Sequence, residues 1–245
     1  MTWDIATADE EWLIDLCHKK GLEGNRVIQL SNQIAVKYDV TAAEAATQEF
    51  ASNTVDSNIV HIPRVYRFIQ AKGLAPKGYL FMEYVPGQNL KVVDLETRKD
   101  LVPRIAQIAA HLSQIQGQSP GPVGGGEPHG YLWGDDAPHA LVLCHLDLCR
   151  RNIILKADGS LCLVDWGSAG FYARLFELAV IPCMLPYDAP YEQPLLQEVE
   201  NVMRLTNEEK RLTQLVHHVR AANLRYLFHE QPSFDYAAFM AKSIQ

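Results

Sequence analysis

The stretch of sequence that decides the fold reads Cys144-His145-Leu146-Asp147-Leu148-Cys149-Arg150-Arg151-Asn152, and Asp165-Trp166-Gly167 follows shortly after it. Between these motifs lie two short apolar runs, residues 153–156 and 161–164, separated by Asp158-Gly159. An Asp-Gly pair between apolar runs is a strong short-range signal for a tight hairpin turn. The two runs are therefore predicted to pair as antiparallel strands.

Folding this hairpin brings three polar side chains to one place. Asn152 precedes the first strand and Asp165 follows the second, so both lie at the open end of the hairpin, with their backbones about 5 Å apart. Asp147 lies on the loop that leads into the same end. One amide oxygen and two carboxylates form a site suited to Mg²⁺, an ion that keeps several waters and is completed by substrate phosphates. The alternative is a hairpin with ordinary polar turn residues, but the joint spacing favours the metal site.

A second hairpin and a helix are predicted upstream. Residues 26–30 and 33–38 are its two strands, and the second strand contains Ile34-Ala35-Val36-Lys37. The helix begins near Thr41, because alanines, the strongest helix formers, follow it. Two glutamates, Glu44 and Glu49, lie on this helix. Thr41-Ala42-Ala43-Glu44 is also a capping box, in which Glu44 would bond the backbone at the helix start.

A further strand, residues 78–85, ends in the break Pro86-Gly87. The order of these motifs resembles a kinase, in which a strand lysine precedes a catalytic-loop Asp with its Asn and a metal-binding Asp. Protein kinases carry Arg where this chain has Leu146, and they have a Gly-rich loop and an A-P-E segment that this sequence does not match. The chain resembles instead the aminoglycoside phosphotransferase and choline kinase superfamily, with loop H-G-D-x-x-x-x-N and metal motif D-W.

Within that superfamily the sequence is most similar to fungal phosphotransferase-domain proteins. The resemblance covers residues from about Lys20 to Glu177. It is carried by the catalytic loop and by Asn25-Arg26-Val27, Val36-Lys37, Ile62-Pro63-Arg64-Val65-Tyr66, Met82-Glu83-Tyr84-Val85-Pro86-Gly87, Val123-Gly124-Gly125-Gly126, Gly170-Phe171-Tyr172 and Glu177.

The resemblance implies an α+β, bilobal, protein-kinase-like fold. Residues 1–85 are expected to form a small N-terminal lobe with an antiparallel sheet and one helix, and residues 86–245 a larger, mostly helical C-terminal lobe. The implied activity is the ATP- and Mg²⁺-dependent transfer of the γ-phosphoryl group to a hydroxyl of a small molecule. Alternatives are a non-catalytic or repurposed kinase-like protein that binds a metabolite or partner and, third, a protein kinase.

The resemblance also assigns a role to each motif residue. Asp147 would accept the proton of the acceptor hydroxyl, and Asn152 and Asp165 would hold the metal ions. Lys37 would contact the α- and β-phosphates, with Glu44 as its partner and Glu49 as the second choice. The strand before Pro86 would be the hinge between the lobes. There, Met82 lines the back of the adenine pocket, while the carbonyl of Glu83 and the amide of Val85 bond the adenine edge.

Two positions depart from the superfamily pattern. Leu146 replaces the usual Gly and puts a bulky side chain beside the base, which would narrow the acceptor site. The phosphate-covering loop would be residues 20–25, where Glu23 is an unexpected neighbour for phosphates because like charges repel. Both departures favour the non-catalytic alternative.

The acceptor site cannot be read from a motif. Acidic residues in the last third are either contacts for a cationic acceptor or solvated surface, and surface is favoured: Glu192, Glu198, Glu200 and Asp235. The Gly/Pro-rich loop of residues 117–138 either borders the acceptor site or is an insertion.

Composition limits the remaining classes. The 245 residues, 48% of them hydrophobic, can bury one substantial core or two modest ones. A formal net charge of −7 argues against a nucleic-acid partner. Five cysteines without C-x-x-C spacing favour reduced thiols. The sequence has neither a secretory signal nor an apolar run of about 18 residues, so a cytoplasmic protein without membrane contact is expected. No pattern predicts an oligomeric state.

Overall fold

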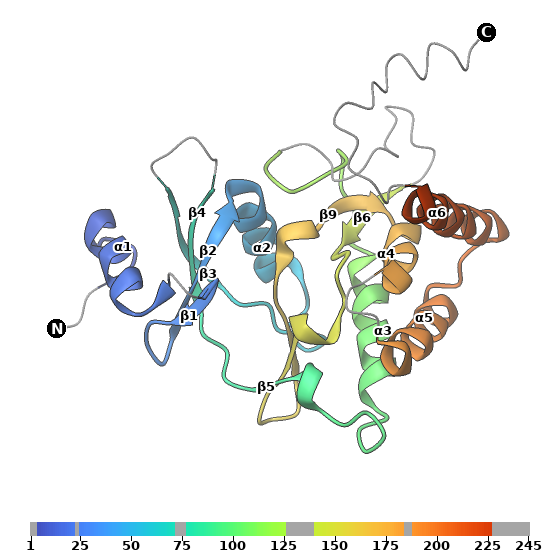
Figure 1. Cartoon of the computed structure of the whole chain (residues 1–245), viewed down its shortest axis with the longest axis horizontal. Coiled ribbons are helices and arrows are strands. Elements are labelled where there is room, and N and C mark those ends of the chain that lie inside the picture. The colour runs from blue at the N-terminus through green and yellow to red at the C-terminus, as the bar shows by residue number, and fades with distance from the viewer. Residues whose placement is uncertain (1–3, 23–24, 72–76, 126–139, 184–187, 227–245) are drawn as a thin grey trace, which may run out of the picture.

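The N-terminal part of the chain is built on a four-stranded antiparallel sheet. The computed structural model describes residues 4–22, 25–71, 77–125, 140–183 and 188–226. The sheet has the order β1-β2-β4-β3, and its strands are β1 (Val27–Gln29), β2 (Ile34–Thr41), β3 (Val65–Gln70) and β4 (Lys77–Glu83). Two helices, α1 (Glu10–Lys19) and α2 (Ala42–Thr54), lie on its opposite sides (Figure 1).

The two faces of this sheet are buried by different helices, as the period of a strand requires. Val36 packs with Leu13 and Cys17 of α1. Its neighbour Ala35 faces the other way and packs with Ala45 of α2. Lys37 follows Val36 and so shares the face of Ala35, which places its side chain beside α2.

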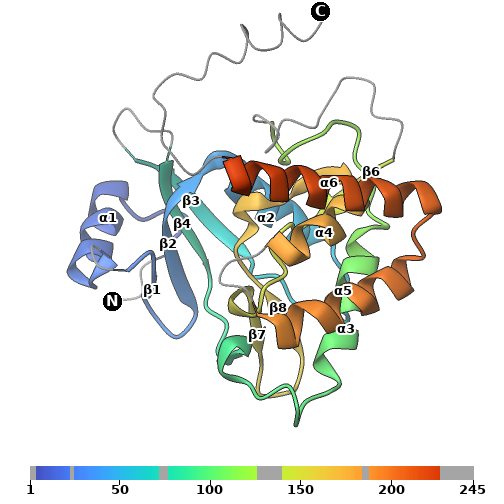
Figure 2. The ribbon, with the colours of Figure 1, turned by 45° about the vertical axis from the view of Figure 1, so that its right-hand side comes forward.

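The C-terminal part is mostly helical. Its helices are α3 (Leu101–Leu112), α4 (Leu175–Val180), α5 (Ala189–Met203) and α6 (Asn207–Tyr226), with short 3₁₀ turns η2 (Leu90–Val92), η3 (Arg150–Asn152), η4 (Trp166–Ser168) and η5 (Ile181–Cys183). Helix α3 packs against α5, and α6 lies along α4 (Figure 2). Helix α3 buries apolar residues that recur at helical spacing: Leu101, Ile105, Ile108 and Leu112. The predicted α+β architecture, an antiparallel sheet followed by a mostly helical part, is confirmed, although the N-terminal part has two helices, α1 and α2, where one was expected.

Two small sheets carry the loops of this part. One has the order β5-β7-β8 and the other pairs β6 with β9. Their strands are β5 (Gln88–Asn89), β6 (Leu141–Cys144), β7 (Ile153–Leu155), β8 (Leu161–Leu163) and β9 (Gly170–Ala173). Strands β7 and β8 pair antiparallel with Ile153 opposite Leu163, and Gly159 in the turn has a φ of 82°. The hairpin predicted from Asp158-Gly159 is therefore confirmed.

The two parts of the chain meet at the β7–β8 hairpin. His61, after α2, bridges Cys162 in β8, because its amide donates to the carbonyl of Leu161 and its carbonyl accepts from the amide of Leu163, both at 2.9 Å. The chain then crosses between the parts at Gly87, where a Cβ atom would lie 2.5 Å from Cγ2 of Ile154 in β7. Glycine is therefore required at this close approach.

The large core also recruits residues from the N-terminal part. Ala51, Val55, Val60 and Ile62 lie before the predicted boundary at residue 85, yet they pack with Leu101 and the other residues of the C-terminal core. The division into residues 1–85 and 86–245 stays a prediction.

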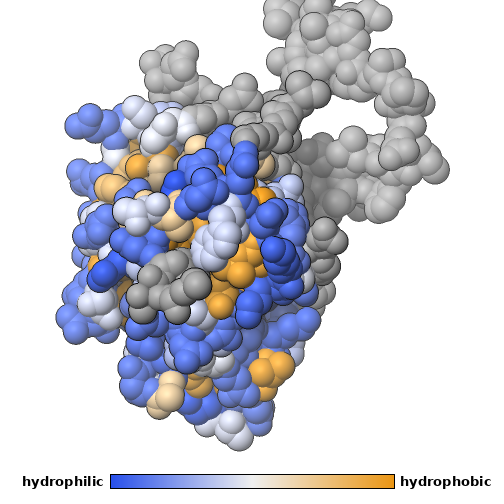
Figure 3. Space-filling view, turned by 90° about the vertical axis from the view of Figure 1, so that its left-hand side faces the viewer, coloured by the Kyte–Doolittle hydropathy of each residue, from blue (hydrophilic) through white to orange (hydrophobic). Residues whose placement is uncertain are grey.

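The outer face over α1 is mainly hydrophilic, with hydrophobic side chains showing between polar ones (Figure 3). Trp12 of α1 is among the large side chains that remain exposed. Within the described ranges, no helix combines the length and the apolar character needed to cross a membrane.

Candidate active site

Asn152 and Asp147 are joined at the open end of the β7–β8 hairpin. The amide Nδ2 of Asn152 donates to the carbonyl oxygen of Asp147 at 3.0 Å and to its Oδ2 at 2.8 Å. The backbone closes the hairpin next to them, since the Val164 amide donates to the carbonyl of Asn152 at 2.9 Å. With Nδ2 occupied, the side-chain oxygen of Asn152 is the atom available to a cation.

Asp165 leaves the other strand of the hairpin in a left-handed conformation, with φ of 68°. Aspartate tolerates this region better than most residues. The turn that follows is held by Trp166, which is fully buried, donates from Nε1 to the carbonyl of Leu163 at 3.3 Å and packs edge-on against His145 at 4.9 Å. This anchored turn presents the carboxylate of Asp165 toward the N-terminal sheet.

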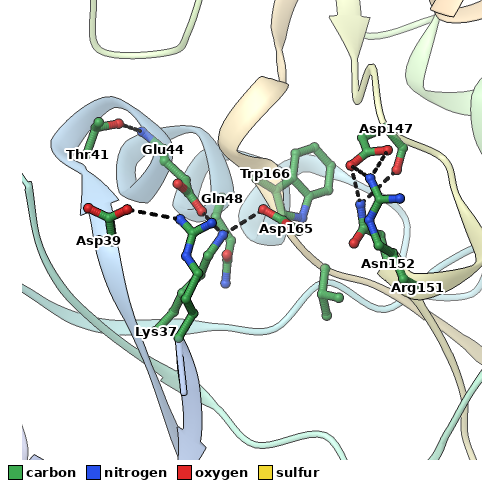
Figure 4. A network of polar contacts seen from close by, with 12 residues as sticks. Lys37, Asp39, Thr41, Glu44, Gln48, Asp147, Arg151, Asn152, Asp165 and Trp166 are labelled. Atoms are coloured by element: carbon green, nitrogen blue, oxygen red, sulfur yellow. Dashed lines mark hydrogen bonds and ion pairs between the residues drawn. The ribbon is translucent and has the colours of Figure 1, made fainter. Parts of the chain in front are cut away.

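Lys37 reaches Asp165 from that sheet. Its Nζ lies 2.5 Å from Oε1 of Glu44 and 2.6 Å from Oδ1 of Asp165, and the three side chains form one ion cluster (Figure 4). Burial lowers the pKa of Lys37, but the two carboxylates outweigh burial and raise that pKa above its usual value. Burial raises the pKa of Asp165, but the ammonium outweighs it and lowers that pKa. Lys37 and Asp165 are therefore both charged.

The carboxylate of Glu44 bonds Lys37, so only one of the two hydrogen bonds of the predicted capping box forms. Its backbone amide donates to Oγ1 of Thr41 at 3.1 Å, while its carboxylate bonds Lys37. Burial raises the pKa of Glu44, and the adjacent ammonium opposes this effect. Gly167 makes room for the carboxylate, because a Cβ atom there would lie 3.0 Å from Oε2 of Glu44. Glu49, the second choice from sequence, is exposed.

The residues predicted to form the hinge lie where β4 ends. Met82 is buried and pairs with Ala35 in β2. Its sulfur accepts a hydrogen bond from Nε2 of Gln48 in α2 at 3.3 Å. The amide of Glu83 donates to the carbonyl of Arg64 at 2.8 Å. In the described part of the chain, no group accepts a hydrogen bond from the amide of Val85. That amide is thus a donor available to a ligand.

His145 and Glu177 fix the loop that carries Asp147. The carboxylate of Glu177, in α4, accepts the backbone amides of His145 at 2.6 Å and Leu146 at 3.0 Å. Burial lowers the pKa of His145 to about 4, so the ring is neutral. Its Nδ1 accepts the Asp147 amide at 3.3 Å and its Nε2 lies 3.2 Å from the carbonyl of Val164, which requires the proton on Nε2. His145 is therefore a positioning residue.

Leu146 lies between these anchors with a φ of 61°. The left-handed region is unfavourable for a branched side chain and open to glycine, which explains why the superfamily motif has Gly there. The Leu146 side chain packs against the cluster of Val142, Cys144 and Tyr172. The predicted narrowing of the acceptor site by Leu146 stays a prediction.

Arg151 is the site residue that the sequence interpretation missed. Its Nη2 donates to both carboxylate oxygens of Asp147, at 2.9 Å to Oδ1 and 2.7 Å to Oδ2. The spacing of four residues was a signal that this pair could form, but that rule holds for helices, and this loop was not predicted to be one. The proposed base thus has a guanidinium as its ion-pair partner.

Two of the acidic residues of the last third, Glu192 and Glu200, bond to neighbouring groups of the chain. Oε1 of Glu192 accepts the Asp188 amide at 3.0 Å, and Glu200 pairs with Lys210 at 2.7 Å. Glu198 is half-buried on α5, and Asp235 lies outside the described residues. The Gly-rich loop is described as far as residue 125, where Val123 donates to Oγ1 of Thr47 in α2 at 3.0 Å. Its remainder to residue 138 lies outside the description.

Comparison with solved structures found the same fold in several kinases. A thermostable mutant of aminoglycoside phosphotransferase APH(4)-Ia, in ternary complex with AMP-PNP and hygromycin B, aligns with a TM-score of 0.53 at 17% identity, over 90% of this chain and 95% of that chain. An aminoglycoside-3'-phosphotransferase of type VIII aligns with a TM-score of 0.52 at 18% identity, over 75% of this chain and 84% of that chain. An aminoglycoside phosphotransferase from Alicyclobacillus acidocaldarius aligns with a TM-score of 0.52 at 14% identity, over 89% of this chain and 87% of that chain.

A search among curated proteins gave no match. The family model described as "Phosphotransferase enzyme family" matches residues 26–138 and 132–201, which together include the ion cluster, the end of β4 and the β7–β8 hairpin. The match extends over more than half of the chain. The chain therefore belongs to the phosphotransferase enzyme family.

Proposed function

We propose that the protein transfers the γ-phosphoryl group of ATP to a hydroxyl of a small molecule in the presence of Mg²⁺. One observation carries this proposal: Lys37, Glu44 and Asp165 form a single ion cluster beside the hairpin end that holds Asp147 and Asn152. A phosphate clamp, metal-binding oxygens and a base are the parts that phosphoryl transfer needs in one place.

The nucleotide would lie between the N-terminal sheet and the hairpin. The Val85 amide and Glu83 carbonyl would bond the adenine edge, and Met82 would close the back of that pocket. Lys37, buried and charged, would then donate to the α- and β-phosphates. Glu44 keeps the ammonium directed toward them by holding one of its donors.

The residues present fit Mg²⁺. Asn152 and Asp165 offer hard oxygen donors, and no cluster of three or more His, Cys, Asp or Glu side chains suited to a metal occurs among the described residues. This composition suits an ion that takes most of its ligands from water and nucleotide. When bound, Mg²⁺ neutralises charge that develops on the phosphates.

Asp147 would act on the acceptor. Its carboxylate accepts the hydroxyl proton while a bond forms between the acceptor oxygen and the γ-phosphorus. The bond from that phosphorus to the β–γ bridging oxygen breaks, and ADP leaves with the electron pair. Asn152 and Arg151 hold the carboxylate oxygens in position for this transfer.

Substitution of the two aspartates tests the proposal. Asp147→Asn and Asp165→Asn are expected to abolish formation of ADP and of an acceptor heavier by about 80 Da, the phosphoryl unit, while both proteins stay folded by circular dichroism. Hygromycin B, present in one similar structure, other aminoglycosides and choline are suitable first acceptors. Asp158→Asn is the matched control, because Asp158 lies in the turn at the far end of the same hairpin. Full turnover in both site variants would refute the proposal.

We also propose that the protein is cytoplasmic. Cysteines 17, 144, 149, 162 and 183 are all free thiols in the structure. Reduced thiols are typical of proteins that stay in that compartment.

A further inference from the structure

Arg26 lies at the edge of the Lys37–Glu44–Asp165 cluster. It directly precedes β1, and its carbonyl accepts the Tyr38 amide at 2.8 Å. The next residue, Val27, lies opposite Lys37 in the strand register. The guanidinium Nη2 of Arg26 lies 3.4 Å from Oδ2 of Asp39. Asp39 lies on β2, two residues after Lys37, so the guanidinium that it contacts lies near the same end of that strand (Figure 4).

The charge of Arg26 acts on the cluster. Burial and Lys37 have the largest effects on the pKa values of Glu44 and Asp165, and Arg26 also lowers both pKa values. These interactions reach from the residue before β1 to α2 and to the turn after β8. Arg26 therefore lies within electrostatic range of both sides of the proposed phosphate site.

The contact that holds Arg26 is weak. The Nη2–Oδ2 distance of 3.4 Å is long for a charge-assisted hydrogen bond, and 68% of the Arg26 side chain is exposed. An exposed ion pair of this kind contributes little to stability. The guanidinium can therefore exchange Asp39 for a stronger anionic partner at small cost.

A further cationic side chain would favour nucleotide binding at this site. Lys37 is bonded to two carboxylates, so much of its charge is already offset within the cluster. Bound Mg²⁺ would offset part of the added phosphate charge, and a second cationic side chain would offset more of it. A guanidinium presents a planar fork of donors that matches phosphate oxygens, and Arg26 lies in the right place to supply it.

We propose that Arg26 is a phosphate-binding residue, which leaves Asp39 and bonds the terminal phosphates of ATP. This inference rests on the proposed function and goes beyond it, because it gives this chain a second phosphate contact in addition to Lys37. It also explains how a chain whose sequence does not match a Gly-rich phosphate loop binds a triphosphate.

Calorimetric titration of the full chain with ATP, ADP and adenosine, each with Mg²⁺, tests the inference. Arg26→Ala is expected to raise the Kd for ATP by roughly tenfold, the loss of one charge-assisted contact, and to leave the Kd for adenosine unchanged. Arg26→Lys keeps the charge and is expected to recover part of the ATP affinity. Arg98→Ala is the matched control, because it removes an arginine–aspartate pair with Asp100 outside the site.

A second variant separates phosphate binding from a structural role. Asp39→Asn releases Arg26 without removing it, and asparagine tolerates the φ of 67° at this position. We expect this variant to bind ATP at least as tightly as the parent. If Asp39→Asn weakened ATP binding as much as Arg26→Ala, or if Arg26→Ala left the ATP-to-adenosine ratio unchanged, Arg26 would be structural. A parent that binds no nucleotide would overturn the proposed function itself, and this inference with it.

Discussion

At the scale of single residues, the arrangement around Asp147 is the most informative feature. Its carboxylate accepts hydrogen bonds from Nδ2 of Asn152 and from Nη2 of Arg151. The backbone of the same loop is tied to Glu177 and to the neutral ring of His145. The proposed base is thus oriented by groups that do not themselves take its proton.

Removal of the Arg151 side chain tests how much this orientation contributes. Arg151→Ala is expected to lower kcat by roughly tenfold, since a misplaced base transfers the proton less often, and to leave KM for ATP unchanged. Steady-state kinetics with both substrates provide the measurement. Arg104→Ala is the control, because Arg104 makes the same four-residue ion pair with Asp100 away from the site. Equal kcat values for the parent and Arg151→Ala would contradict an orienting role.

Glu177 gives a prediction about pH. Burial raises the pKa of this carboxyl from 4.5 to about 7 in the folded protein, although two backbone amides act against it. The folded state therefore binds more protons than the unfolded chain between these two pH values, so stability falls as the pH rises through this window. The contribution is on the order of 3 kcal/mol and is lost in full above about pH 7.

Urea unfolding at pH 5 and pH 8 measures this effect. The parent is expected to lose more free energy of unfolding between the two values than Glu177→Gln, whose side chain does not titrate. The comparison between the proteins cancels the other titrating groups. Identical losses in the two proteins would show that Glu177 does not carry the pH dependence.

At the scale of elements, the contact between α2 and the turn after β8 decides whether Lys37 has its partner. Gly167 of that turn lies against the Glu44 carboxylate, where a Cβ atom would approach Oε2 to 3.0 Å and Cδ to 3.3 Å. The position of α2 and its Glu44 thus depends on the absence of a side chain at Gly167.

Gly167→Val is therefore expected to displace Glu44 and weaken ATP binding by roughly tenfold, as expected for disruption of one buried charged contact. Thermal shift with ATP and Mg²⁺ measures the change. Ser168→Val, at the exposed neighbouring position, is expected to bind like the parent. A normal shift in Gly167→Val would mean that the turn accommodates the side chain without moving α2.

Two capping sequences show why local patterns predict elements better than side-chain partners. At Thr206 and Glu209 the box is complete: Oγ1 of Thr206 accepts the Glu209 amide at 3.2 Å, and Oε2 of Glu209 accepts the Thr206 amide at 2.8 Å. At Thr41 and Glu44 only the first bond forms, because Lys37 takes the carboxylate. Both patterns correctly start helices. Only the tertiary structure decides where each glutamate points.

At the scale of the whole molecule, the sequence predicted the elements that depend on short stretches of neighbouring residues. Asp158-Gly159 predicted the β7–β8 hairpin, and the alanines after Thr41 predicted the start of α2. Helix α5 was not predicted, since Pro190 and Pro194 interrupt its pattern. Pro190 lies in the first turn, where a proline costs a helix little, and Pro194 lies inside the helix. Arg151 was missed because its contact depends on the shape of a loop. Resemblance, not periodicity, supplied the overall architecture.

The ion pair between Lys37 and Asp165 joins residues 128 positions apart. Contacts of such long sequence separation form slowly, because closing the long loop between them costs conformational entropy before the contact can stabilise the chain. An intermediate with only one of the two parts folded therefore lacks the complete phosphate site. During refolding, the appearance of ATP binding is thus expected to follow the last tertiary step, and a nucleotide would slow unfolding without speeding the early collapse of the chain.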